Sequence, residues 1–140
     1  MTNCHSDLID RLSKLDAPDR GMDAEIEVAV RRIEAARSGS AEEYWANWQA
    51  SPDGTIYDPH TRYSSNPFTA SVDAVIALAR RLYPDVMYRV GNDGEGPDPS
   101  LYLGEIFIPG EQNDSYFTGV SPVDAASLCI ALLRAKEASK

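Results

Sequence analysis

Five side chains in and beside the loops of this sequence have the types that hold a small anionic ligand with a planar base. Aromatic rings stack on a base, a tyrosine hydroxyl donates a hydrogen bond, and a guanidinium binds a phosphate through two parallel N–H donors. The five are Trp45, Arg62, Tyr63, Arg89 and Tyr116. They suggest a nucleotide-type ligand site. The alternative is that these aromatic side chains cover a sheet edge and fill the core beneath a long loop.

A second feature is clustered negative charge. The 140-residue chain has 22 Asp+Glu against 13 Lys+Arg, a net charge of −9. Between positions 85 and 121, Arg89 is the only cation and the acids are Asp85, Asp93, Glu95, Asp98, Glu105, Glu111 and Asp114. These acids could engage a basic protein surface, such as the nucleic-acid groove of a nuclease, and speed association with it. The alternative is a solvated acidic face that keeps the protein soluble.

The placement of the arginines separates a ligand site from an acidic binding surface. Convergence in a concave pocket, especially across subunits, favours an anionic ligand, whereas scattering favours a basic protein partner. The arginines in question are Arg31, Arg32, Arg62, Arg80, Arg81 and Arg89. Because nucleic acid and anionic membranes need a basic surface, the acidic balance predicts no direct DNA binding and no membrane binding.

The sequence offers little for metal or redox chemistry. Its cysteines are Cys4 and Cys129, its histidines are His5 and His60, and it contains no C-x-x-C motif. Adjacent residues such as Cys4 and His5 cannot both reach one zinc ion in a normal tetrahedral site. Cys129 lies in an apolar helical run, which predicts a buried, inert thiol without a disulfide to Cys4. We therefore expect no metal and no cofactor.

Catalytic motifs are also missing. His60, Asp58 and Ser64 have the residue types of a hydrolytic triad, but the sequence lacks the nucleophile elbow G-x-S-x-G, so a solvated loop histidine is expected. The glycine-rich stretch 91–99 fits neither a calcium loop nor a phosphate-binding loop, and is typical of a hairpin turn. These observations favour a binding protein over an enzyme.

Helical periodicity appears in four segments. Ser71 is expected to cap the third helix and Pro84 to end it, while Ser121 is expected to cap the fourth, with Pro122 at its first position. The segments are 6–16, 22–39, 69–84 and 121–140.

Alternating hydrophobicity predicts strands over 86–90 and 101–108, joined by a turn, with a third short strand near 115–120. Glu105 is the only charge in the second strand, which predicts that most of both sheet faces are covered. Shorter extended pieces are expected around 56–57 and 62–63. The fold class is therefore α+β: a small antiparallel sheet packed by flanking helices in a sandwich-like arrangement, with two N-terminal helices.

The pattern divides a single domain, 1–140, into three parts. These are an N-terminal helical segment (1–39), an aromatic and proline-rich connecting region (40–68) and a helix–hairpin–helix core (69–140). No run approaches the 18 apolar residues of a membrane span, and the N-terminus lacks the pattern of a secretion signal, so a cytoplasmic location is expected.

Three segments carry recognisable motifs of helix caps and of core alanines and leucines. Their residues are the run 8–26, then Phe68, Thr69, Ala70, Ser71, Asp73 and Ala74, then Ser121, Pro122, Ala125, Leu128, Cys129, Ala131, Leu133, Arg134 and Ala135. Over 6–30 and 66–138, the chain thereby resembles small uncharacterised proteins of tailed phages and prophages and, more distantly, the phage alpha-beta-alpha sandwich domain and NinX-like proteins. This resemblance implies a fold lineage and a phage accessory protein in an infected bacterium, and it brings no catalytic residues.

Taken with this resemblance, the sequence predicts a non-enzymatic counter-defence protein. Our first hypothesis is a homo-oligomer that sequesters a small nucleotide-type host signal. The alternative is an acidic inhibitor, anti-CRISPR-like or mimicking nucleic acid, that binds a basic surface of a host defence protein.

Overall fold

The computed structural model describes residues 4–38, 48–57, 61–92, 101–110 and 114–138. Its helices are α1 (Cys4–Ser13), α2 (Arg20–Ser38), α4 (Val72–Leu82) and α5 (Asp124–Ala138). Its strands are β1 (Gln49–Ala50), β2 (Thr55–Tyr57), β3 (Arg62–Ser64), β4 (Met87–Asn92), β5 (Tyr102–Ile108) and β6 (Ser115–Ser121).

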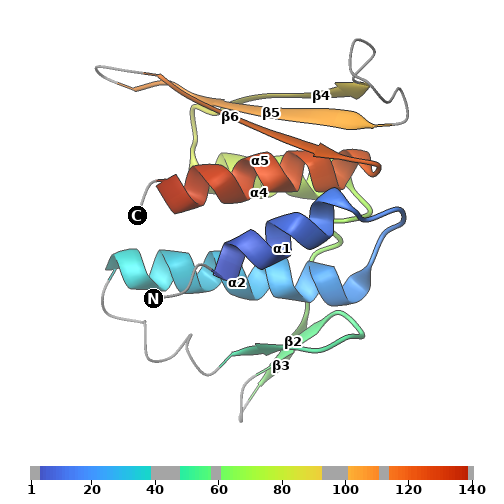
Figure 1. Ribbon diagram of the computed structural model, residues 1–140. Helices are drawn as coiled ribbons and strands as arrows, with labels where there is room; N and C mark the ends of the chain where they lie inside the picture. The colour runs from blue at the N-terminus through green and yellow to red at the C-terminus, as the bar shows by residue number, and fades with distance from the viewer. Residues whose placement is uncertain (1–3, 39–47, 58–60, 93–100, 111–113, 139–140) are drawn as a thin grey trace.

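These elements stack in layers, as Figure 1 shows. The sheet β4–β5–β6 lies over α4 and α5, helices α1 and α2 form the next layer, and the smaller sheet β1–β2–β3 lies beyond α2. Both sheets are antiparallel. The α+β class, the small helix-packed sheet and the two N-terminal helices predicted from the sequence are confirmed.

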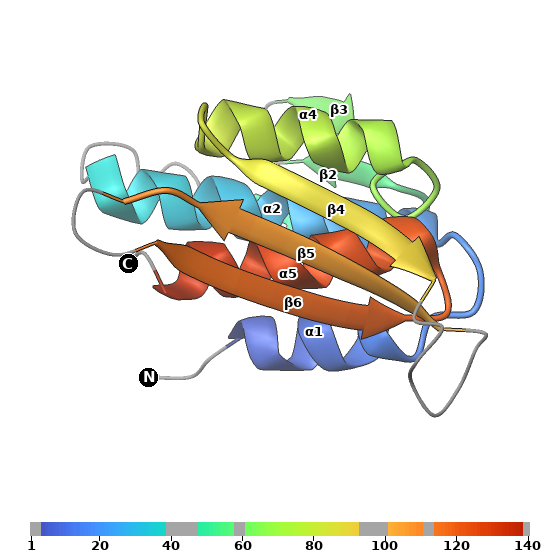
Figure 2. The same cartoon turned by 90° about the horizontal axis from the view of Figure 1, so that it is seen from above.

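Helix α5 is the central element. The strands of the larger sheet cross over it in Figure 2, and its residues from Ala125 to Leu133 are almost completely buried. The inner sheet face approaches it closely at two glycines: a Cβ on Gly104 would lie 2.5 Å from the backbone nitrogen of Leu128, and one on Gly119 would lie 2.5 Å from Cβ of Ile130. The helix therefore rests directly on the sheet backbone.

Two helix starts were predicted from serine caps, and one of them is confirmed. The Ser71 side chain accepts a hydrogen bond from the backbone N–H of Ala74 at 3.2 Å, and α4 ends just before Pro84. The prediction for the last helix is wrong, because Ser121 is the final residue of β6. Its hydroxyl donates to the backbone oxygen of Leu12 at 2.8 Å and accepts from the N–H of Val123, so α5 begins only at Asp124.

The smaller sheet confirms the predicted extended pieces at 56–57 and 62–63. Gly54 supplies the positive φ, 93°, that the turn before β2 requires. Ile56 and Trp48 are buried against Ala24 and Val28 of α2, so this sheet closes a second, smaller hydrophobic cluster.

The larger sheet is covered unevenly. Its inner face is covered by helices, and no residue of β5 is exposed, which agrees with the prediction that most of both faces is covered at this strand. On the outer face, however, Met87 of β4 and Tyr116 of β6 are 54% and 57% exposed. No helix in the part of the chain that the structure describes combines the length and the apolar character needed to cross a membrane.

Candidate functional site

The outer face of β4–β5–β6 presents three rows of side chains. Alternation along each strand and the pairing register set the rows: Met87–Phe107–Tyr116, then Arg89–Glu105–Thr118, then Gly91–Leu103–Val120. We call the eight side chains of these rows the outer sheet face. Apolar and aromatic groups thus surround one central carboxylate.

Glu105 organises this face. Its carboxylate accepts a hydrogen bond from Arg89 Nε at 2.6 Å through one oxygen and from the Tyr116 hydroxyl at 2.9 Å through the other. Glu105 is itself almost buried, whereas the side chain of Arg89 is 79% exposed. Three strands therefore contribute one residue each to a hydrogen-bonded triad at the middle of an open face.

The triad changes the titration of all three groups. The hydrogen bond from Arg89 is the main reason that the pKa of Glu105 lies below its ordinary value, with the Tyr116 hydroxyl adding to the effect. The hydrogen bond to Glu105 raises the pKa of Tyr116 and of Arg89. Glu105 is therefore held as an anion and Tyr116 as a neutral donor through the physiological range, which favours binding over proton transfer.

Replacing Tyr116 with phenylalanine tests this pairing by its pH dependence. Because the pKa of Glu105 is lower in the folded than in the unfolded state, its stabilisation is present above the unfolded pKa and is lost as the pH falls. Because the pKa of Tyr116 is higher in the folded state, its contribution is lost as the pH rises through the folded-state pKa. We expect the difference in unfolding free energy between wild type and Tyr116→Phe to be largest between about pH 5 and pH 9 and to shrink outside that window. Urea titrations at five pH values measure it, and a difference that is independent of pH would contradict the triad.

The residues predicted for one ligand site fall into separate groups. Arg89 and Tyr116 meet through Glu105 on the outer sheet face. Arg62 and Tyr63 lie on β3 in the other sheet, beyond the helical layers in Figure 1. Trp45 lies outside the described residues. Within one copy of the chain, the described residues predicted for the ligand site therefore form two separate groups.

Arg62 and Tyr63 do not converge with each other either. As consecutive residues of a strand they point to opposite faces of the sheet. The Tyr63 ring stacks on the buried ring of Trp48, with centroids 5.6 Å apart, while the Arg62 guanidinium lies 6.0 Å from the centroid of Tyr57. Tyr63 thus covers the edge of the small cluster, as expected if the aromatic side chains cover a sheet edge and do not bind a ligand.

The six arginines do not share one element of the fold, although their placement was to separate an anionic-ligand site from an acidic binding surface. They lie on α2, β3, α4 and β4, and Arg31, Arg32 and Arg80 contact different partners. Arg31 pairs with Glu27, Arg32 donates to the backbone oxygen of Trp48, and Arg80 lies over the ring of Tyr88 and donates to its hydroxyl. The described residues therefore show no convergence of these arginines on a common pocket.

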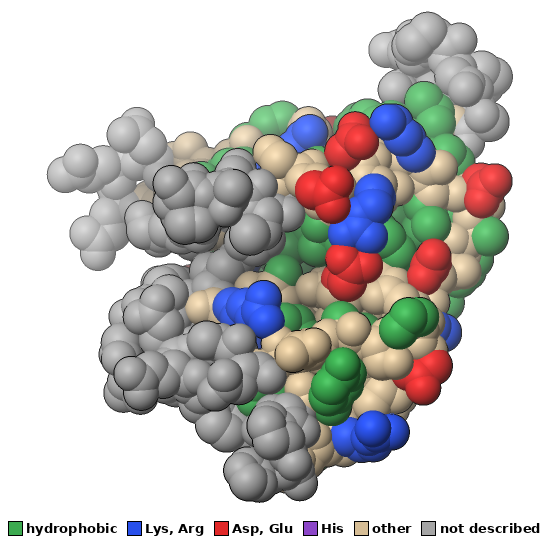
Figure 3. Space-filling model, turned by 60° about the horizontal axis from the view of Figure 1, so that its bottom comes forward, with side chains coloured by type: hydrophobic (Ala, Val, Ile, Leu, Met, Phe, Trp, Pro, Cys, Tyr) green, Lys and Arg blue, Asp and Glu red, His purple; other side chains and the backbone are tan. Residues whose placement is uncertain are grey.

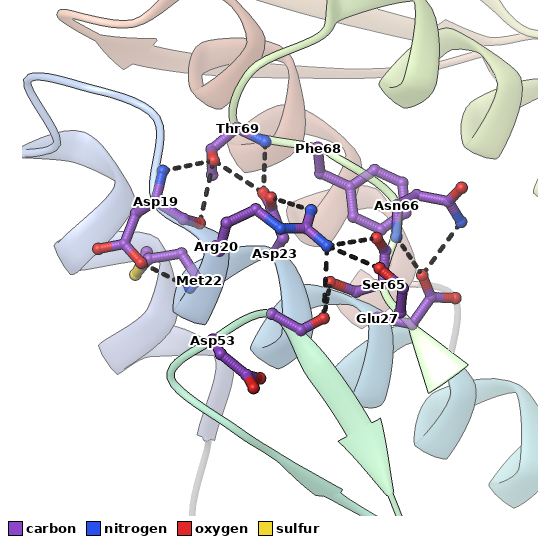
Figure 4. A network of polar contacts seen from close by, with 12 residues as sticks. Asp19, Arg20, Met22, Asp23, Glu27, Asp53, Ser65, Asn66, Phe68 and Thr69 are labelled. Carbon is purple, nitrogen blue, oxygen red and sulfur yellow. Dashed lines mark hydrogen bonds and ion pairs between the residues drawn. The ribbon is translucent and has the colours of Figure 1, made fainter. Parts of the chain in front are cut away.

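A polar network joins α2 to the segment before α4, as Figure 4 shows. Asp23, completely buried, accepts hydrogen bonds from Thr69 N–H and the Thr69 hydroxyl, both at 2.7 Å, and from Arg20 at 2.7 Å. Buried Glu27 accepts from Asn66 and Arg31. Because these bonds tie two buried carboxylates of α2 to Asn66 and Thr69, we interpret the network as a structural clamp.

Among the described residues, the remaining candidates for chemistry do not form a site. Cys129 is free and buried as predicted, and burial raises the pKa of its thiol, so it is inert. Of the proposed triad residues, Asp58 and His60 lie outside the described positions. Within the described residues, no three Asp, Glu, His or Cys side chains gather in a way that could hold a metal ion.

The side of the molecule with α1 and the smaller sheet has charges of both signs, as Figure 3 shows. Arg11 pairs with Asp7 and Glu25, and Lys14 pairs with Asp10. Such exposed pairs add little to stability and leave little net charge on this surface.

Comparison of the chain with protein-family models, with curated proteins and with solved structures gives no match.

Proposed function

We propose that this chain is a non-enzymatic, acidic binding protein whose partner is a protein with a basic surface. The observation that carries the proposal is the scatter of its arginines, which leaves no cationic pocket among the described residues for an anionic ligand. Of the two hypotheses raised by the sequence, the structure thus gives more support to the protein-directed one.

The pairing of the cations supports a surface of net negative charge. Arg11, Arg20, Arg31 and Arg89 each form an ion pair with a carboxylate of this chain. By contrast, Asp85 and Asp114, which lie beside the larger sheet, are exposed and form no ion pair within the described residues. Unpaired exposed carboxylates attract a basic partner over a Debye length and raise its association rate.

Two of the exposed acids lie at the same end of the larger sheet. Asp85 precedes β4 and Asp114 precedes β6, and these strands begin at the same end of the sheet because Met87 and Tyr116 share a row. Asp93, Glu95 and Asp98 follow β4 in the chain, outside the described residues. The connections of this sheet are therefore where we place the binding charge.

The resemblance to phage and prophage proteins suggests the setting for this binding. In an infected bacterium, an acidic protein of this size could occupy the basic groove of a host defence protein and block it, which is a counter-defence role. A separate experiment tests this setting. The protein is expressed during phage infection of hosts with and without a defence system, and the progress of infection is compared.

Neutralising the acidic connection between β4 and β5 tests the binding itself. The test variant carries Asp93→Asn, Glu95→Gln and Asp98→Asn; the control carries Asp10→Asn, Asp16→Asn and Asp73→Asn, with the same change in net charge. Proteins captured from a host lysate are identified by mass spectrometry, and the affinity of the recovered partner is measured. We expect about a tenfold loss for the test variant, less than about threefold for the control, and weaker binding at higher salt.

Two results would contradict the proposal. One is a partner whose affinity is indifferent to salt and to the test variant. The other is saturable heat in calorimetry with cyclic dinucleotides or ADP-ribose derivatives, which would favour a nucleotide ligand instead.

A further inference from the structure

We propose that the outer sheet face binds a second copy of this chain, forming a two-fold dimer in which the two sheets pack face to face. This inference is independent of the proposed function. It rests on the exposure, the row pattern and the charge of the outer sheet face.

The exposure of this face indicates an interaction surface. Met87, Tyr116 and Val120 are three of the four large hydrophobic side chains recorded as exposed in the described residues, and all three lie here. Tyrosine, methionine and arginine are enriched at protein interfaces, and all occur among the eight residues of the face. The face is the flat side of a three-stranded sheet, which suits a second sheet better than it suits a small molecule.

The row pattern makes the face complementary to itself. A two-fold axis parallel to β5 exchanges the edges of the sheet and keeps every row at its level, so β4 of one copy lies over β6 of the other. In the first row this brings Met87 opposite the partner's Tyr116, and the reverse contact follows by symmetry. A methionine against an aromatic ring is a favourable contact. The two most exposed apolar groups of the face thus cover each other.

The charge of the face also suits a second copy. The axis along β5 sets Glu105 opposite the partner's Glu105, but each carboxylate is already hydrogen-bonded to Arg89 of its own chain, so pairing two faces buries no unpaired charge. The chain has a net charge of −9, so two copies repel each other through the surfaces outside this face. This repulsion also predicts that salt strengthens the dimer, the opposite of its effect on a basic partner.

Analytical ultracentrifugation of the full chain tests the proposal. We expect a monomer–dimer equilibrium with a dissociation constant on the order of 10–100 μM, as for a small interface, and tighter association at 0.5 M than at 0.05 M NaCl. Met87→Glu is expected to weaken the dimer at least about tenfold, since it places a carboxylate in the centre of the apolar contact. The control Ala77→Glu puts the same charge on the exposed side of α4 and is expected to change the dissociation constant of the dimer only slightly.

A mixing experiment tests the geometry. Tyr116→Lys alone is also expected to be monomeric, but an equimolar mixture of Met87→Glu and Tyr116→Lys is expected to form a one-to-one heterodimer, since the introduced carboxylate then faces the introduced ammonium group. Circular dichroism and thermal melting of each variant verify that it folds. A wild-type chain that stays monomeric at 1 mM, a dimer that survives Met87→Glu, or a mixture that does not associate would each overturn the proposal.

Discussion

Replacement of Gly104 with alanine is expected to destabilise the protein by about 3 kcal/mol or more, the upper range for an overpacked core. The added Cβ would lie 2.5 Å from the Leu128 nitrogen and 2.6 Å from its Cα, far inside the 3.5–4.0 Å of ordinary carbon contacts. These atoms are helix backbone, so α5 as a whole must move away from the sheet. That movement would weaken the packing of Ile106 and of the whole buried face of α5.

Gly91 provides the matched control. It lies on β4 of the same sheet, but a Cβ there meets no atom within 4 Å, and its φ is not positive. Gly91→Ala is therefore expected to change the unfolding free energy by less than about 0.5 kcal/mol. Urea denaturation with equal m-values measures both variants. Similar midpoints for Gly104→Ala and Gly91→Ala would show that α5 does not rest on the sheet backbone.

Removal of the Asp23 carboxylate is the second substitution with a large expected effect, about 3 kcal/mol for Asp23→Ala. The change leaves the buried N–H of Thr69 without its acceptor and opens a cavity beneath the segment before α4, while the Thr69 hydroxyl keeps the backbone oxygen of Asp19 as an acceptor. Each unsatisfied buried polar group costs about 1–3 kcal/mol. Arg20 also loses its ion pair, but it retains the backbone oxygen of Ser65 as an acceptor.

Asp10→Ala is the control for Asp23→Ala. The Asp10 side chain is 61% exposed and pairs with Lys14 one helical turn away, so its loss is expected to cost no more than about 0.5 kcal/mol. Hydrogen exchange adds a local readout: the amide of Thr69 is expected to lose protection in Asp23→Ala and to keep it in Asp10→Ala. Equal stability of the two variants would contradict the interpretation of the network as a clamp.

Features set by neighbouring residues were predictable from the sequence. Ser71 caps α4 through an N–H only three residues away, and Pro84 prevents the helix from continuing. Alternation correctly predicted a strand over 101–108, and in β5 Glu105 and Phe107 lie on one face and Ile106 on the other. Both signals depend on local backbone geometry.

Features set by distant partners were not predictable. The start of α5 differs from the sequence pattern because the Ser121 hydroxyl bonds to Leu12, 109 positions earlier in the chain. The hydrogen bonds of Glu105 were not predicted, since its partners Arg89 and Tyr116 become its neighbours only through strand register. Equally, nothing in the sequence near Arg62 and Tyr63 shows that they belong to a different sheet from Arg89.

The central place of α5 has a consequence for synthesis on the ribosome. This helix follows every other described element in the chain, yet it packs against both the inner sheet face and the helices on the other side. Until it emerges, buried residues such as Ile106, Val75 and Leu12 lack their principal cover. The nascent chain therefore stays sensitive to proteases and to chaperone capture until the last helix docks and closes both layers in one cooperative step.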